Sequence, residues 1–126
     1  MSTPTETPPA AATLSPQDQM VALIEFLRDT QSAAGFHFGI DTGDGVNSMG
    51  DLFDKPLDLL AYIRGATGQT GAAAGKPLVV AGQPENSAFY QLVTKTTHPM
   101  FSKFKLVVPI LGKAGVEVVE QWIKSL

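Results

Sequence analysis

Two glycine-rich stretches constrain this chain most, because they limit the length of any regular element. Residues 32 to 51 and 65 to 75 are rich in glycine and small polar residues, and they show no sustained apolar period. Glycine loses more conformational freedom on folding than other residues, so neither stretch favours a helix or a strand. The segments around them are long enough for short helices. We therefore expect a small all-α, loop-rich fold.

The two ends of the expected domain carry the clearest helical patterns. Ser15 and Pro16 suit the cap and the first position of a helix, and apolar residues then recur at helical spacing. This pattern predicts a helix from about residue 16 to residue 30. A second amphipathic segment predicts a closing helix over residues 113 to 126, with Gly112 as its cap. The apolar positions behind these predictions are Met20, Leu23, Ile24 and Leu27, then Val116, Val119, Trp122, Ile123 and Leu126.

Two shorter helices are expected between these ends. Pro56 suits the first position of a helix that runs to about residue 64, and Gly65 would end it. A third helix would be capped by Asn86 or Ser87 and run to about residue 95. The apolar positions expected on one face of the helix that starts at Pro56 are Leu57, Leu60 and Ile63.

For one apolar segment the sequence predicts neither a helix nor a strand. Residues 101 to 111 are apolar and aromatic, but Pro109 interrupts them. Because proline lacks the amide hydrogen that helices and central strands use, we expect this segment to be irregular.

The composition indicates one domain. The chain has 126 residues, no cysteine and a net charge of −3. We expect a single domain over residues 14 to 126 and a disordered tail over residues 1 to 13, which hold almost nothing to bury.

The basic residues are scattered, which argues against nucleic acid as a partner. No leader pattern is seen, and no apolar run approaches the roughly 18 residues that span a bilayer. We expect no membrane partner and a cytoplasmic location, or a periplasmic one if a leader has been removed.

Three motifs in the second half of the chain occur together in one known family. They are the run from Val79 to Val93, which contains Gln-Pro-Glu-Asn-Ser, then His98-Pro99-Met100, and Gln121-Trp122-Ile123 near the end. In this combination the chain resembles small bacterial cytochrome c domains. The resemblance covers residues 14 to 126 and is most specific in the last third of the chain. It implies a four-helix fold whose N- and C-terminal helices cross, with Trp122 near the crossing.

The chain departs from that family at the haem attachment motif, C-x-x-C-H. In the corresponding stretch, Ala33 and Phe36 take the places of the cysteines and His37 follows. Covalent attachment needs both thiols, so a covalent haem is chemically excluded. By the resemblance, His37 and Met100 could still ligate a non-covalent, b-type haem. The other interpretation is a lost site, in which Phe36 fills the pocket, Met100 packs in the core, and His37 and His98 are exposed or hydrogen-bonded.

Other local motifs fall short of a catalytic or metal site. Asp41-Thr42-Gly43 matches the aspartic protease signature, but that chemistry needs a paired Asp on a β-rich scaffold. Gly71 to Pro77 is one residue too short for a phosphate-binding P-loop, and Pro77 replaces the magnesium ligand. The oxygen-bearing residues Asp41, Asp44, Asn47 and Asp51 do not have the calcium-loop spacing. We therefore expect no enzymatic activity and no metal site.

These observations predict a non-catalytic accessory domain with a degenerate, haem-free cytochrome c-like fold that binds a protein partner. The alternative is an electron-transfer protein that holds a b-type haem between His37 and Met100. The aromatic residues expected to form the contact surface for the partner are Phe36, Phe38, Phe101 and Phe104.

Overall fold

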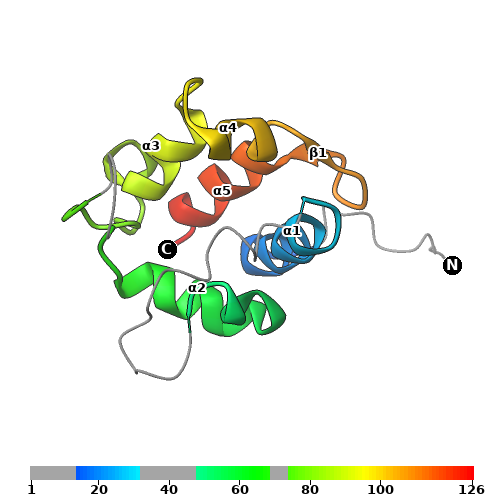
Figure 1. The fold of residues 1–126 in the computed structure, drawn as a ribbon, viewed down its shortest axis with the longest axis horizontal. Coiled ribbons are helices and arrows are strands. Elements are labelled where there is room, and N and C mark those ends of the chain that lie inside the picture. Colours follow the sequence, from blue (N-terminus) through cyan, green and yellow to red (C-terminus); the bar gives the residue numbers. More distant parts are fainter. Residues whose placement is uncertain (1–13, 32–47, 69–73) are drawn as a thin grey trace, which may run out of the picture.

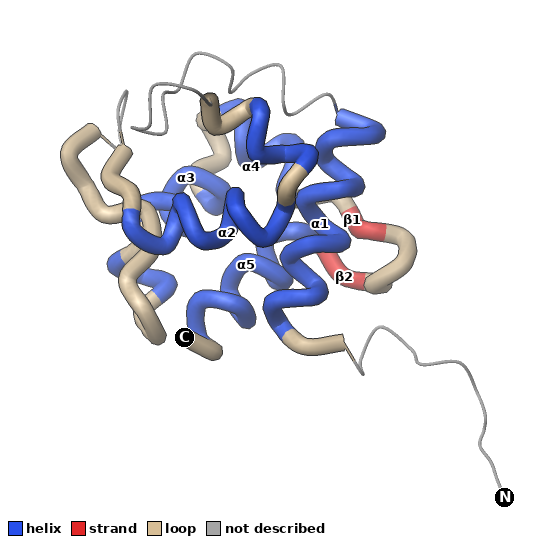
Figure 2. Tube along the Cα trace, turned by 90° about the horizontal axis from the view of Figure 1, so that it is seen from below, coloured by secondary structure: helices blue, strands red, loops and turns tan. Residues whose placement is uncertain are grey.

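The structure, a computed structural model, describes residues 14–31, 48–68 and 74–126. Within these residues the fold is mostly helical, with one small antiparallel sheet, as expected for the all-α class (Figures 1 and 2). The expected tail over residues 1 to 13 lies outside them. No helix in the described ranges is long and apolar enough to cross a bilayer. The elements are α1 (Pro16–Gln31), η4 (Asp51–Asp54), α2 (Pro56–Gly65), η6 (Pro84–Asn86), α3 (Ala88–Thr94), α4 (Pro99–Phe104), β1 (Val107–Val108), β2 (Lys113–Ala114) and α5 (Gly115–Lys124).

Helix α1 begins where the capping pattern predicted. The amide of Asp18 donates to Oγ of Ser15 at 3.1 Å, which satisfies one of the free amides of the first turn. The apolar face of the helix is buried as a continuous stripe. Its buried apolar residues are Met20, Leu23, Ile24 and Leu27.

Helices α1 and α5 form the most extensive helix contact of the described fold, and they lie side by side near its centre (Figure 1). Trp122 on α5 is 1% exposed and belongs to the same core as the apolar face of α1. The packing is tight at Gly115, where an added Cβ atom would lie 2.9 Å from Cδ1 of Leu23 and 3.1 Å from the carbonyl oxygen of Phe104. A side chain at position 115 would therefore push α5 away from Leu23 and from the end of α4.

Helix α2 has the expected bounds but not the expected face. Leu60 and Ile63 are buried together with Leu59. Leu57, which was expected on the same face, is 56% exposed and faces solvent. The expectation was wrong at this position because the buried face is centred on Leu59, Leu60 and Ile63, and Leu57 lies roughly a third of a turn away from its centre.

The turn between Val79 and α3 is held by one hydroxyl group. Ser87 was expected to cap α3, but its side chain makes no capping hydrogen bond. Its Oγ atom instead accepts from the amide of Val80 at 2.8 Å and donates to the carbonyl of Gln83 at 2.9 Å. Gly82, with a φ of +74°, donates its amide to the carbonyl of Ile123 and so joins this turn to α5.

The segment expected to be irregular contains α4 and a β-hairpin. β1 and β2 pair Val107 with Ala114 and Val108 with Lys113. Gly112 has a φ of +65° and lies in the hairpin turn, so the expectation that it caps α5 was wrong. Helix α5 starts two residues later than expected, with Ala114 at the cap position.

Candidate interaction surface

The methionine expected as a haem ligand lies on the first turn of α4. Met100 is half-buried and packs against the hydrophobic core. Its amide donates to Nδ1 of His98 at 3.1 Å, so that imidazole serves as the cap of α4. His37 lies outside the described residues, as do Ala33 and Phe36. The described residues therefore hold one of the expected ligands, and the His37/Met100 pair stays a prediction.

The other motif residues show no convergent chemistry where they are described. Asp51 accepts from the amide of Ser48 at 2.8 Å and from its Oγ at 3.1 Å, so this carboxylate closes the turn before η4. Asp41, Asp44 and Asn47 lie outside the described residues. No group of three or more His, Cys, Asp or Glu side chains in the described ranges is placed to hold a metal ion.

The aromatic residues expected at the contact surface do not form one where they are described. Phe104 is buried, and its ring meets that of Phe89 edge to face at 5.7 Å, so its assignment to the surface was wrong. Phe101 is half-buried, with Nζ of Lys105 5.8 Å from its ring centre. Phe36 and Phe38 lie outside the described residues.

The exposed apolar surface lies instead at the tip of the hairpin. Val107 is 57% exposed and Ile110 is 72% exposed, and Pro109 between them is also exposed. We call these three residues the hairpin tip. Sequence reasoning missed it, because the apolar run from 106 to 111 has no alternation that shows which side chains face outward.

The hairpin tip is anchored on both sides. Val108 and Leu111 point into the core and are almost fully buried. The carbonyl of Val108 accepts from the amides of Leu111 and Gly112, both at 2.9 Å. The amide of Gly115 donates to the carbonyl of Leu106 at 3.0 Å. The hairpin tip is therefore already held in one conformation, so little conformational entropy would be lost when it binds a partner.

A polar network fixes the base of the hairpin to the helices. Nζ of Lys113 donates to Oε1 of Gln19 at 3.0 Å and to Oε1 of Gln121 at 2.9 Å. Gln19 is buried, and its Nε2 donates to the carbonyl of Leu14. The lysine thus ties β2 to α1 and α5 through neutral amide groups, and its charge has no carboxylate partner among the residues described.

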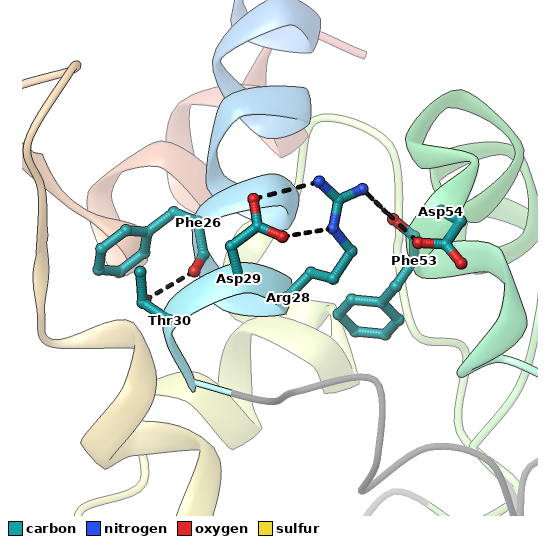
Figure 3. A network of polar contacts seen from close by, with 6 residues as sticks. All are labelled: Phe26, Arg28, Asp29, Thr30, Phe53 and Asp54. Atoms are coloured by element: carbon teal, nitrogen blue, oxygen red, sulfur yellow. Dashed lines mark hydrogen bonds and ion pairs between the residues drawn. The ribbon is translucent and has the colours of Figure 1, made fainter.

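A second network lies at the other end of α1 (Figure 3). Nε and Nη2 of Arg28 donate to the carboxylate of Asp29 at 2.8 and 3.2 Å, and Nη1 donates to the carbonyl of Phe53 at 3.3 Å. The hydrogen bonds from Arg28 hold the pKa of Asp29 below its ordinary value. The cluster joins α1 to η4, and Nη1 of Arg28 also lies 3.7 Å from Oδ1 of Asp54, so we assign it a structural role.

Comparison with known proteins gives no relative: no family model matches the chain, and neither curated proteins nor solved structures show a significant match.

Proposed function

We infer that this chain is a non-catalytic accessory domain with a haem-free, cytochrome c-like fold, and that it binds a protein partner through the hairpin tip. The observation that carries the proposal is the exposure of Val107 and Ile110 on a turn whose neighbours are buried. Large aliphatic side chains on a rigid protrusion are suited to fill a pocket on a partner, where a few anchors supply most of the binding energy.

The packing of the helices supports the cytochrome c-like fold in this proposal. The resemblance implies that the first and last helices cross and that Trp122 lies near the crossing. Helices α1 and α5 do pack on one another, and Trp122 is buried in the core they share. A small helical core with a projecting hairpin can serve as a binding module without any catalytic group.

Photo-crosslinking from the hairpin tip tests the proposed surface. A photo-reactive amino acid at position 110 should form adducts with a defined protein in cells that produce the chain naturally. The same probe at Glu85, an exposed residue of η6, should form none of these adducts. Adding Val107→Asp should abolish them, because a carboxylate in an apolar pocket is desolvated without a partner.

The matched control is Thr96→Asp, which adds the same charge at another exposed position. It should leave the adducts unchanged. If positions 110 and 85 give the same adducts, or if Val107→Asp has no effect on them, the hairpin tip is not the binding surface.

A hemin titration separates the proposal from its alternative. The haem-free scaffold predicts no saturable Soret band, because without the thioether anchor we expect Phe36 to fill the pocket and Met100 to pack in the core. A six-coordinate, low-spin spectrum that is lost in a His37→Ala, Met100→Leu double variant would instead establish b-type haem binding. Visible absorption of the oxidised and reduced protein gives the answer.

A further inference from the structure

The hairpin tip lies in a part of the chain that has no acidic residue. Residues 86 to 116 contain four lysines, whereas all twelve Asp and Glu residues lie elsewhere. Lys105 precedes the apolar run, and Lys113 pairs with Val108 across the hairpin. Neither lysine forms an ion pair with a residue that the structure describes. Nζ of Lys113 is held at the base of the hairpin by Gln19 and Gln121. Lys105 is exposed and therefore supplies the unbalanced positive charge beside the apolar run, and an acidic counterpart would complement it.

An apolar position with acidic neighbours lies on α2. Leu57 is 56% exposed, and the described residues contain only three exposed large aliphatic side chains: Leu57, Val107 and Ile110. The segment from Asp51 to Asp58 carries three carboxylates and one lysine, so its net charge is negative. Asp58 is exposed and makes no ion pair with any described residue. Asp54 on η4 is already paired with Arg28, Oδ1 to Nη1 at 3.7 Å. We therefore call Leu57 with the carboxylate of Asp58 the α2 surface.

The hairpin tip and the α2 surface belong to different sides of the molecule, since β1 lies well away from α2 (Figure 1). The two cannot meet within one chain, but they can meet between chains. We propose that the hairpin tip of one copy binds the α2 surface of a second copy, with Val107 and Ile110 against Leu57 and Lys105 facing Asp58. This inference rests on the proposed function, since it uses the same tip, and it names the partner as this chain itself.

Such a contact joins unlike surfaces, so it is head-to-tail and leaves a free surface of each kind at the ends. The area that these few side chains can bury is small, which places the contact among weak, transient ones. Because exposed charges take part, salt should weaken it: the screening length falls from about 10 Å at ~0.1 M salt to about 3 Å at ~1 M.

Sedimentation of the full chain with charge-reversal variants tests the inference. The average mass of the wild type should rise with concentration up to about the millimolar range that weak contacts require, and the rise should diminish in ~1 M salt. Lys105→Glu and Asp58→Lys should each stay monomeric alone, because like charges then face each other. An equimolar mixture of the two variants should associate again, since the opposite charges are restored between the chains. Circular dichroism checks that both variants remain folded.

Each other outcome overturns the inference in a distinct way. If the wild type stays monomeric while residue 110 forms adducts with another protein in cells, the partner is not this chain and the proposed function stands. If the wild type stays monomeric and residue 110 forms no adducts, both proposals fail. If the monomer floats with vesicles that contain phosphatidylserine, and Lys105→Glu abolishes this, the tip binds an anionic membrane instead. Association that neither single variant reduces shows a contact elsewhere on the molecule.

Discussion

Replacing Trp122 by alanine is expected to lower the free energy of unfolding by about 3–5 kcal/mol. Trp122 is 1% exposed and is the largest of the fully buried side chains. Its removal would leave a cavity between α1 and α5 that the helices cannot fill without losing other contacts. Since small domains are stable by only about 5–15 kcal/mol, this is a large share of the total. Urea unfolding followed by far-UV circular dichroism measures the effect, because the variant has no tryptophan to follow.

Two further variants show whether the loss of stability comes from removing buried apolar volume. Trp122→Phe keeps most of the buried apolar volume, so its cost should be clearly smaller than that of Trp122→Ala. Ile110→Ala removes an exposed side chain and should change stability by less than about 0.5 kcal/mol. Equal losses for Trp122→Ala and Ile110→Ala would contradict the placement of Trp122 in the core.

The helices that the sequence predicts well are those with both a boundary signal and a periodic face. For α1, Ser15 and Pro16 mark the start and the apolar stripe marks the buried face, and the structure agrees on both. For α2, Pro56 and Gly65 mark the bounds correctly. The burial of Leu57 was predicted wrongly, because apolar residues surround much of this short helix and the pattern did not show that the face with Leu59, rather than the one with Leu57, meets the core.

The hairpin was missed because proline was taken as evidence against any regular structure. Pro109 lies in the turn between β1 and β2, where its missing amide costs no ladder hydrogen bond. The sequence signals that could have indicated it are the β-branched pair Val107-Val108 and the glycine at position 112, which adopts a positive φ in the turn. The candidate surface was missed for the same reason, since only the pairing register determines that Val107 faces outward and Val108 inward.

The contact between α1, α4 and α5 should not tolerate a side chain at position 115. Gly115→Val is expected to lower the free energy of unfolding by about 3 kcal/mol, near the upper end for overpacked sites. A Cβ atom there would lie 3.1 Å from the carbonyl oxygen of Phe104, a backbone atom that cannot rotate away. The amide of Gly115 is itself bonded to the carbonyl of Leu106, which holds the start of α5 in place. Urea unfolding gives the loss directly.

Gly65→Val is the matched control, because Gly65 is also a helical glycine and a Cβ atom there would meet nothing within 4 Å. Valine is a better helix former than glycine, so this variant should be as stable as the wild type or slightly more stable. Equal changes in the free energy of unfolding for valine at positions 65 and 115 would refute the close packing of Leu23 and Phe104 around Gly115.

The part of the clash that comes from Leu23 can be isolated by a double-mutant cycle. Cδ1 of Leu23 would lie 2.9 Å from a Cβ atom at position 115. Leu23→Ala alone should cost about 2–5 kcal/mol because Leu23 is buried in the core. In that background Gly115→Ala should cost less than it does in the wild type, since the new methyl group partly fills the space that Leu23 vacates. Strict additivity of the two changes would mean that the side chain of Leu23 can move aside at no cost. The clash with the backbone of Phe104 would then account for the whole cost of a Cβ atom at position 115.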